Sequence, residues 1–188
     1  MPESGRAAPA PADLLAAEIV ERAARLGLRI AVAESLTGGM LASRIVSVPG
    51  ASRVLTGAIV AYDTALKASL LGVDPERLAA NGPVDAEVAR QMAAGVRVAC
   101  AAPAAGEPVS GAPLPADIGV ATTGVAGPLP DAQTGQPAGT VWIGVSSPLG
   151  DRSERLAGAE GDRAAIREAS VGGALELLAA EIALLEGR

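Results

Sequence analysis

The alternation of two hydrophobic patterns is the feature of this sequence that most constrains its fold. Short β-branched runs, typical of buried strands, alternate with longer segments in which apolar residues recur at helical spacing. Strands that alternate with helices form a mostly parallel sheet that is covered on both faces. The sequence therefore predicts an α/β fold, a three-layer α/β/α sandwich with a mostly parallel but mixed sheet of about five strands.

Turn and cap residues mark the boundaries of these elements. Asp at a helix start, Pro in the first turn and Gly after the last turn are the strongest such signals. They place strands at 29–33, 54–61, 118–122, 140–145 and, at an edge of the sheet, 152–157. Helices are predicted at 13–26, 40–47, 65–71, 85–100 and 162–185, and another begins at Asp74-Pro75.

Length and composition fit one domain. The chain has 188 residues, of which 49% are hydrophobic and 19% charged, the balance of a globular protein. Residues 12–188 are expected to form this domain. The Pro- and Ala-rich residues 1–11 predict a disordered tail, and a second stretch without apolar periodicity predicts a flexible surface loop at about 101–116.

Charge argues against two classes of binding partner, and cysteine content indicates the cellular compartment. The net charge of -6 and the scattered arginines argue against binding to nucleic acid or to an anionic membrane, because both need clustered basic residues. No apolar run is long enough to span a bilayer, and the N-terminus does not resemble a signal peptide. Together with the single cysteine, Cys100, these features predict a cytoplasmic protein.

The absence of histidine narrows the chemistry that an active site of this chain can use. Without histidine there is no Ser-His-Asp or Cys-His centre and no histidine-ligated zinc. A general base, if the protein is an enzyme, must be a carboxylate, a lysine, a tyrosine or a bound water.

Lys67 is the only lysine among 15 basic residues, and it lies five positions after the only tyrosine, Tyr62. Both stand at the junction of a predicted strand and the following helix. Arginine stays protonated in proteins whereas a desolvated lysine can lose its proton, so a site that needs a neutral amine would keep a lysine. The alternative is a solvated lysine on the helix surface beside a core tyrosine.

Ser35 follows the first predicted strand and precedes a glycine turn into the next helix. Its hydroxyl is expected to project beyond the sheet, where backbone N–H groups near Gly38 and Gly39 suit an oxyanion or a phosphate. The alternative is that Ser35 or Thr37 caps the helix. Glu34 is a candidate base, and equally a residue that binds backbone groups or pairs with an arginine.

Two further segments are candidates for ligand binding. The loop that holds Thr123, Gly124, Ala126 and Gly127 follows a strand, and its glycines let the backbone approach a ligand, although turns need glycine in any case. Arg163 lies in the first turn of the last helix, where it opposes the helix dipole. It either serves a bound anion or is an ordinary exposed arginine.

The pair Gly172-Gly173 interrupts the last predicted helix with two poor helix formers. Such a pair indicates either close packing of the helix or the face of a homodimer. No chemistry follows from it.

Several motifs together resemble the C-terminal domain of the competence-damage-inducible protein CinA and its stand-alone relatives, the nicotinamide-nucleotide amidases. The motifs occur in the order of that family and span about Asp13 to the C-terminus. They are Ala33-Glu34-Ser35 with Thr37-Gly38-Gly39, Val48-Pro49-Gly50-Ala51-Ser52, Tyr62 with Lys67, Leu71-Gly72-Val73, Thr123-Gly124-Val125-Ala126-Gly127-Pro128, Gly139-Thr140-Val141-Trp142 and Gly161-Asp162-Arg163.

The resemblance implies an activity that belongs to pyridine-nucleotide salvage. It implies hydrolysis of the carboxamide of nicotinamide mononucleotide to nicotinate mononucleotide and ammonia, without a metal or a cofactor. Ser35 would be the nucleophile, Lys67 its base and Tyr62 an assisting residue. Substrate contacts would come from Glu34, from the turn Thr37, Gly38 and Gly39, and from Thr123, Gly124, Ala126, Gly127 and Arg163.

The sequence also departs from the family pattern around the expected substrate rim. Many relatives have a cysteine in place of Leu36, Ser-Asn-Glu-Ala in place of residues 63–66, and glycines in place of Leu129-Pro130-Asp131. The loop after Cys100 is also longer than in these relatives. A non-catalytic nucleotide-binding or regulatory module with the same fold is therefore the alternative to the amidase.

Overall fold

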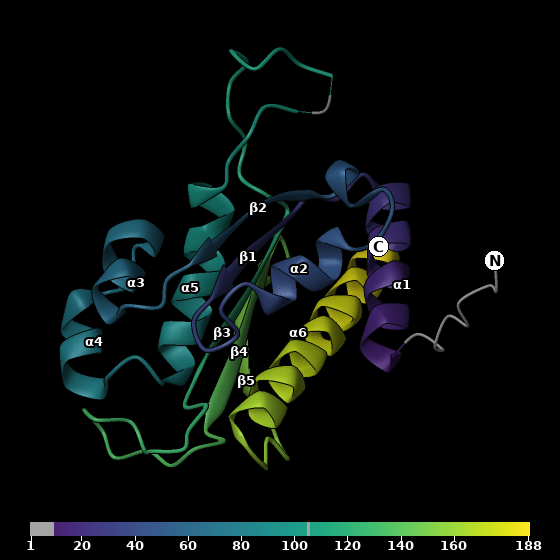
Figure 1. The fold of residues 1–188 in the computed structure, drawn as a ribbon. Coiled ribbons are helices and arrows are strands. Elements are labelled where there is room, and N and C mark those ends of the chain that lie inside the picture. Colours follow the sequence, from purple (N-terminus) through teal and green to yellow (C-terminus); the bar gives the residue numbers. More distant parts are fainter. Residues whose placement is uncertain (1–9, 105) are drawn as a thin grey trace, which may run out of the picture.

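The structure is a computed structural model that describes residues 10–104 and 106–188 (Figure 1). Its strands are β1 (Ile30–Glu34), β2 (Leu55–Val60), β3 (Ile118–Gly124), β4 (Val141–Ser147) and β5 (Gly150–Arg155). Its α-helices are α1 (Pro11–Leu26), α2 (Met40–Val46), α3 (Thr64–Leu71), α4 (Pro75–Asn81), α5 (Ala86–Ala99) and α6 (Arg163–Glu186), with a short 3-10 helix at Ala51–Arg53.

The five strands form one mixed sheet in the order β2-β1-β3-β4-β5. β1 pairs in parallel with β2 and β3, whereas β4 is antiparallel to both β3 and β5. The carboxyl ends of the three parallel strands therefore lie at the same end of the sheet. Ligand sites of open α/β sheets form beyond this end.

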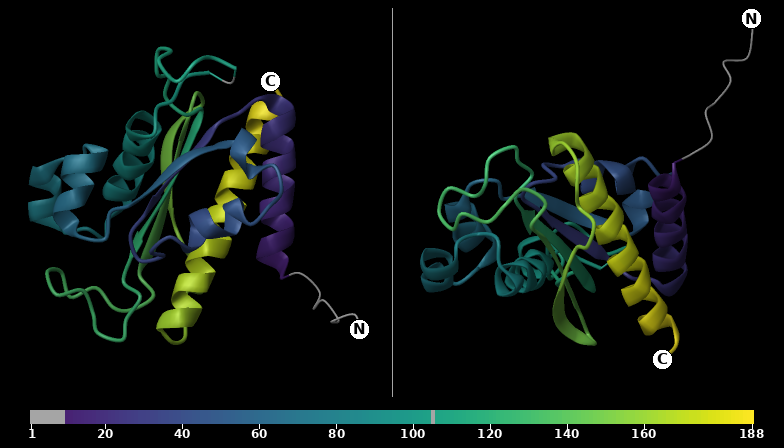
Figure 2. Two further views of the ribbon diagram at one scale, coloured as in Figure 1. Left: turned by 45° about the horizontal axis from the view of Figure 1, so that its top comes forward. Right: turned by 90° about the horizontal axis from the view of Figure 1, so that it is seen from below.

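Helices cover both faces of the sheet, and the left view in Figure 2 shows the three layers edge-on. α3, α4 and α5 lie on one face, and α1, α2 and α6 lie on the other. One buried apolar cluster fills the space under α1, α2 and α6, and a second lies under α3 and α5. The predicted α/β/α sandwich with a mixed five-stranded sheet is confirmed.

Strand β1 is buried along its whole length and contributes to both cores. Ile30 and Val32 belong to the cluster under α6, and Ala31 and Ala33 to the cluster under α5. Successive side chains of a strand point to opposite faces. The residues that directly follow β1 continue this alternation, so neighbouring side chains there also point to opposite faces of the sheet.

Helix α5 packs unusually close to its neighbours, because glycines stand at the contacts. A Cβ atom at Gly119 of β3 would lie 2.0 Å from the carbonyl oxygen of Ala93, and Gly144 of β4 is similarly tight. At Gly95 of α5, a Cβ atom would lie 1.8 Å from the carbonyl oxygen of Leu71, the last residue of α3. The positions of α3 and α5 are therefore set by backbone-to-backbone contact.

Most helix starts follow the predicted caps. Asp74, Asp85 and Asp162 each accept a hydrogen bond from a backbone N–H in the first turn of their helix. Helix α1 differs, because it begins at Pro11 and Asp13 is its third residue, with a carboxylate that accepts from the Ala10 amide. Of the predicted tail, residues 1–9 lie outside the described residues, and Pro11 is helical instead.

The two glycines of α6 have different surroundings. A Cβ atom at Gly173 would lie 2.6 Å from Leu156 Cδ1 and 2.8 Å from Ile143 Cδ1, whereas one at Gly172 would have nothing within 4 Å. Close packing therefore accounts for Gly173. The homodimer stays a prediction.

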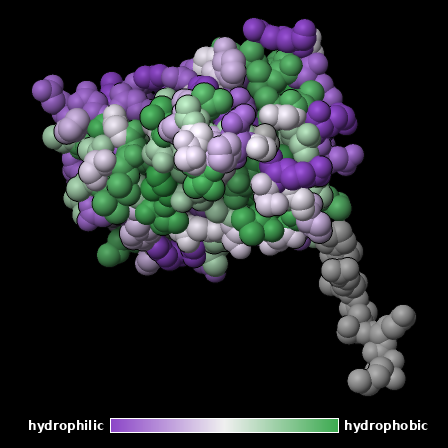
Figure 3. Space-filling model, turned by 90° about the horizontal axis from the view of Figure 1, so that it is seen from above, coloured by the Kyte–Doolittle hydropathy of each residue, from purple (hydrophilic) through white to green (hydrophobic). Residues whose placement is uncertain are grey.

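Residues 101–104 and 106–116 project from the end of the sheet at which β3 begins (Figure 1). A bridge between Ala102 and Leu114 closes the base of this loop, and Arg29 donates to the carbonyl oxygens of Ala102 and Pro115. Figure 3 looks onto this end of the molecule, where apolar side chains gather in the middle and hydrophilic ones toward the rim. The loop lies at the end of the sheet opposite the carboxyl ends of β1, β2 and β3 (Figure 1).

Every helix within residues 10–104 and 106–188 is too short or too polar to cross a membrane.

Candidate active site

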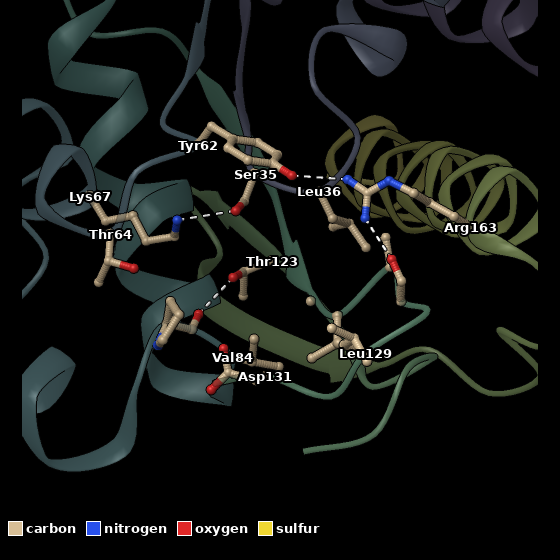
Figure 4. Close-up of a pocket in the computed structure, with 15 residues that line it drawn as sticks. Ser35, Leu36, Tyr62, Thr64, Lys67, Val84, Thr123, Leu129, Asp131 and Arg163 are labelled. Carbon is tan, nitrogen blue, oxygen red and sulfur yellow. Dashed lines mark hydrogen bonds between the residues drawn. The ribbon is translucent and has the colours of Figure 1, made fainter. Parts of the chain in front are cut away.

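The side chains of Ser35 and Lys67 meet beyond the carboxyl ends of the parallel strands (Figure 4). Lys67 Nζ lies 3.0 Å from Ser35 Oγ and donates a second hydrogen bond of 2.8 Å to the carbonyl oxygen of Ala61. Ser35 itself is fixed by its amide, which donates to the carbonyl oxygen of Thr122 in β3. Two residues 32 positions apart in the sequence thus form a nucleophile–amine pair.

Lys67 is buried although it carries an ionisable amine. Only 1% of the residue is exposed, and it is among the largest fully buried side chains of the described residues. Burial lowers the pKa of Lys67 from 10.5 to about 8, while the carboxylate of Asp63 acts in the opposite direction. An amine with a pKa of about 8 is neutral in roughly a tenth of the molecules at pH 7, and this neutral form is the one that can act as a general base.

Helix α3 carries Lys67 into the site because of its caps. Asp63 caps the helix by accepting a hydrogen bond from the Ala65 amide, and Gly72 ends it. Lys67 then lies one turn inside the helix, on the face that packs against the sheet and α5. The alternative of a solvated surface lysine is wrong.

Tyr62 and Arg163 line the same pocket as Ser35 and Lys67. Arg163 donates from Nη2 to Tyr62 Oη at 2.9 Å and from Nη1 to the carbonyl oxygen of Gly127 at 2.8 Å (Figure 4). Tyr62 is 60% exposed, so it is not the core tyrosine of the alternative interpretation. These contacts join the start of α6 to the loops after β2 and β3.

The pocket between these groups has a volume of about 250 Å³. Thr123 lies on its floor and donates a hydrogen bond to the carbonyl oxygen of Pro83. The lining consists of Ser35, Leu36, Tyr62, Thr64, Lys67, Pro83, Val84, Thr123, Gly124, Val125, Ala126, Gly127, Leu129, Asp131 and Arg163. The structure thus brings together eight of the predicted site residues: Ser35, Tyr62, Lys67, Thr123, Gly124, Ala126, Gly127 and Arg163.

Residues 125–140 form a loop of their own at the pocket rim. Two hydrogen bonds close its neck, from the Val125 amide to the Thr140 carbonyl and from the Gly139 amide to the Val125 carbonyl, each 2.8 Å long. Side-chain amides of Gln133 and Gln136 then tie the loop to the carbonyl oxygens of Leu78, Ala79 and Val84. We call this segment the rim loop.

Asp131 organises the rim loop. Its carboxylate accepts hydrogen bonds from the amides of Gln133 and Thr134 and from the Thr134 hydroxyl. Asp131 and Leu129 both line the pocket. Four of the residues named above as departures from the family pattern, Leu36, Thr64, Leu129 and Asp131, therefore line the pocket, whereas the loop after Cys100 lies at the opposite end of the sheet (Figure 1).

Four predicted site residues do not line the pocket. The carboxylate of Glu34 is buried and accepts hydrogen bonds from the amides of Gly39, Leu41 and Ala42, so it serves the start of α2. The amides of Gly38 and Gly39 are engaged within the turn, the first by the Ser35 carbonyl and the second by Glu34. They are not available to an oxyanion.

Thr37 is the fourth of these residues. Its hydroxyl is buried and shares a 2.8 Å hydrogen bond with the hydroxyl of Thr122. The side chain therefore joins the turn to β3 and does not face the ligand. Gly39 and not Thr37 or Ser35 is the N-cap of α2, so the capping alternative for the two hydroxyls is wrong.

Several residues of the site were not predicted from the sequence. Arg167 donates hydrogen bonds to the carbonyl oxygens of Leu36 and Thr37, directly behind Ser35. One signal pointed to it, because Arg167 lies four positions after Arg163 and so on the same face of α6. Val84 carries no signal of this kind in the sequence, whereas Thr64 and part of the rim loop lie where the sequence departs from the family pattern.

Metal ligands do not gather anywhere in the described part of the chain. No group of three or more cysteine, aspartate or glutamate side chains there has the arrangement that a metal ion needs. The titratable group that points into the pocket with a strongly shifted pKa is Lys67.

Two curated relatives of this chain are both named CinA-like proteins. A 'CinA-like protein' from Frankia casuarinae is 48% identical over 162 residues, which cover 85% of this chain and 32% of that protein. Another from Gloeobacter violaceus is 44% identical, over 90% of this chain and 37% of that protein. The chain spans about a third of the length of these curated relatives.

A solved structure has the same fold over nearly all of both chains. The competence/damage inducible protein CihA from Agrobacterium tumefaciens superimposes with a TM-score of 0.78 at 32% identity, covering 92% of this chain and 96% of that one. The family model for the CinA C-terminal domain matches residues 12–182. By sequence and by fold, the chain belongs to the CinA C-terminal domain family.

Proposed function

We propose that this protein is an amidohydrolase that converts nicotinamide mononucleotide and water into nicotinate mononucleotide and ammonia. The observation that supports this most directly is the 3.0 Å contact between the buried amine of Lys67 and the hydroxyl of Ser35. A serine is a weak nucleophile unless a base takes its proton. In a chain without histidine, this amine is the base within reach.

Lys67 is oriented for that role by its second contact. A neutral amine has two N–H groups and one lone pair. When one N–H donates to the carbonyl oxygen of Ala61, the lone pair is left to accept the proton of the Ser35 hydroxyl. The hydrogen bond between the two side chains then runs from serine to lysine.

The reaction follows in two stages. Ser35 Oγ bonds to the carboxamide carbon while its proton passes to Lys67, and the carbon–nitrogen bond breaks as Lys67 returns that proton to the leaving ammonia. A water molecule then attacks the ester on Ser35, with Lys67 again taking the proton. The bond between the acyl carbon and Ser35 Oγ breaks as Lys67 returns this proton to the serine oxygen, which releases nicotinate mononucleotide and regenerates Ser35.

The remaining pocket residues are suited to hold the nucleotide. Arg163 presents a guanidinium at the pocket rim with hydrogen bonds to a phenol and a carbonyl oxygen, and both are contacts that an anionic phosphate can compete with. Thr123, Gly124, Ala126 and Gly127 also line the pocket, and their glycines let the backbone lie close to a ligand. These residues would contact the ribose phosphate.

Ammonia release from nicotinamide mononucleotide by the purified protein in the presence of a chelator tests the proposal. Ser35→Ala should abolish turnover and still bind the substrate in calorimetry, because the nucleotide contacts remain while the nucleophile is lost. Undiminished ammonia production by this variant would remove Ser35 from the mechanism. Binding of nicotinamide mononucleotide by the wild-type protein without any ammonia release would instead select the non-catalytic binding module.

A further inference from the structure

Arg167 is directed at the backbone behind the nucleophile. Its Nε donates to the Leu36 carbonyl and its Nη2 to the Thr37 carbonyl, both at 2.9 Å. The residue is partly buried in α6, and all its hydrogen bonds to described residues go to these two oxygens. A planar guanidinium that binds two successive carbonyls fixes the orientation of both peptide units.

The turn that Arg167 holds follows directly on Ser35. The Gly38 amide donates to the Ser35 carbonyl at 3.2 Å and closes the turn, and Gly38 and Gly39 have positive φ angles of 59° and 97°. From the other side, the Glu34 carboxylate accepts from the Gly39 amide. The turn is therefore held between β1 and α6.

One consequence concerns the amide of Leu36. It makes no hydrogen bond to any described residue, and Leu36 lines the pocket beside Ser35. In a trans peptide the N–H points away from the C=O. The Ser35 carbonyl is turned toward the Gly38 amide inside the turn. The Leu36 N–H, on the opposite side of the same peptide unit, therefore points out of the turn.

The position of this amide suits a specific task. When a serine oxygen attacks an amide, the substrate oxygen gains negative charge, and preorganised N–H donors stabilise it. In hydrolases whose nucleophile stands on a sharp strand-to-helix turn, the amide of the residue after the nucleophile is one such donor. Leu36 is that residue here, whereas the amides of Gly38 and Gly39 are already engaged.

We infer that Arg167 is a positioning residue that holds the turn after Ser35 so that the Leu36 amide stabilises the oxyanion of the reaction. The inference rests on the proposed function, because it needs Ser35 to be acylated. Arg167 does not touch the substrate in this scheme. It acts through the Leu36 and Thr37 carbonyls.

Arg167→Ala and Arg167→Lys test the inference. Loss of one oxyanion donor lowers kcat by about 10²- to 10³-fold in other enzymes. Because Arg167→Ala misplaces the donor without deleting it, we expect kcat to fall by about 10- to 100-fold with KM within about twofold of wild type. Arg167→Lys keeps the charge but lacks the planar guanidinium that fixes both carbonyls, so its kcat should lie between those of wild type and the alanine variant. Guanidinium ion added to the alanine variant should restore part of kcat.

Arg29→Ala is the matched control. Arg29 also donates to two backbone carbonyls, those of Ala102 and Pro115, but at the far end of the sheet. Its loss should lower the melting temperature without changing kcat, and guanidinium should not raise its kcat. The pH dependence of all variants should stay that of wild type, because Lys67 keeps its surroundings.

The outcomes separate this inference from the proposed function. Acylation of Ser35 by 4-nitrophenyl acetate provides a second assay that needs the nucleophile and the oxyanion donor but no nucleotide contacts. Wild-type protein that is inactive in both assays overturns the proposed function and the inference with it. Active wild-type protein together with an Arg167→Ala variant that keeps full kcat, or loses only KM, overturns the inference alone.

Discussion

Lys67 combines two properties that rarely occur together, complete burial and a titratable amine whose main hydrogen-bond acceptors are neutral. Desolvation disfavours the charged form, and the pKa falls to about 8 as a result. The surrounding groups are the Ser35 hydroxyl and the Ala61 carbonyl, with Asp63 as the charged neighbour that opposes the shift. Arginine offers no neutral form under these conditions.

Replacement of Lys67 by arginine is therefore expected to inactivate the enzyme although it keeps the positive charge. The pKa of a guanidinium lies far above the working pH, so arginine stays protonated and cannot take the serine proton. We expect kcat to fall roughly 10³-fold or more, as when other nucleophile–base pairs lose a member. Ammonia release measures the loss, and circular dichroism checks the fold. A variant within a few-fold of wild type would reduce Lys67 to an electrostatic or structural role.

The same pKa sets the pH dependence of the reaction. Below about pH 8 the folded protein holds Lys67 protonated, and the protonated amine cannot act as a base. kcat/KM should therefore rise with pH, tenfold per unit well below the pKa, and level off above it. A pH series from 6 to 10 on nicotinamide mononucleotide measures this. A profile that is flat through pH 8, or that falls there, contradicts a neutral Lys67 as the base.

Arg163 is expected to act on binding and not on chemistry. In the free protein its guanidinium contacts Tyr62 Oη and the Gly127 carbonyl. Arg163→Ala removes one charged contact to the phosphate, at a cost of about 2 kcal/mol, or about 30-fold in KM, with kcat little changed. The phosphate-free nucleoside is the control substrate. An equal loss on both substrates would show that Arg163 does not contact the phosphate.

At the scale of elements, sequence patterns predicted nearly every helix and strand, because local signals mark their ends. Asp85 and Asp162 cap their helices as predicted, and Gly72 ends α3. The start of α1 was misplaced by two residues, since Pro11 already has a backbone suited to the first helical turn. Periodicity and capping depend on residues close together in the sequence, so they predict where helices and strands begin and end.

The prediction that Glu34 contacts the substrate is wrong, because its carboxylate binds amides at the start of α2. Alternation along β1 sends Ile30 and Val32 toward α6 and Ala33 toward α5. Extended by one residue at a time, the pattern puts Glu34 on the α2 side and Ser35 on the Lys67 side. The sequence contained this distinction. The sequence left open whether Ser35 or Thr37 caps α2, whereas the N-cap is Gly39, which has no capping side chain, and the carboxylate of Glu34 binds the first amides of the helix instead.

Two helical glycines give a matched test of the packing. Gly95→Ala forces a Cβ atom to within 1.8 Å of the Leu71 carbonyl oxygen, whereas Gly172→Ala meets nothing within 4 Å. Alanine is favoured over glycine in a helix by about 0.8–1 kcal/mol, so Gly172→Ala should raise the melting temperature. Gly95→Ala should lower the free energy of unfolding by about 1–3 kcal/mol or more. Denaturant unfolding of both variants measures this, and a stabilised Gly95→Ala protein would contradict the close approach of α3 to α5.

At the scale of the whole molecule, the site is assembled from segments that lie far apart in the sequence. The order of the strands brings the residues after β1, β2 and β3 to one end of the sheet, where open α/β sheets bind their ligands. The contact between Arg167 and the Leu36 carbonyl joins residues 131 positions apart. No local signal encodes such a contact, because it depends on how α6 crosses the sheet.

The rim loop is attached to the rest of the protein almost entirely through backbone groups, so it should be exchangeable between relatives as one segment. Its neck is closed by two backbone hydrogen bonds between Val125, Gly139 and Thr140, and its glutamine anchors bind only backbone carbonyls of the neighbouring segment. Every relative with this backbone offers the same acceptors whatever its side chains. Grafting residues 126–138 onto such a relative should therefore carry over the pocket wall formed by Leu129 and Asp131, and substrate preference should be inheritable as one contiguous piece of sequence.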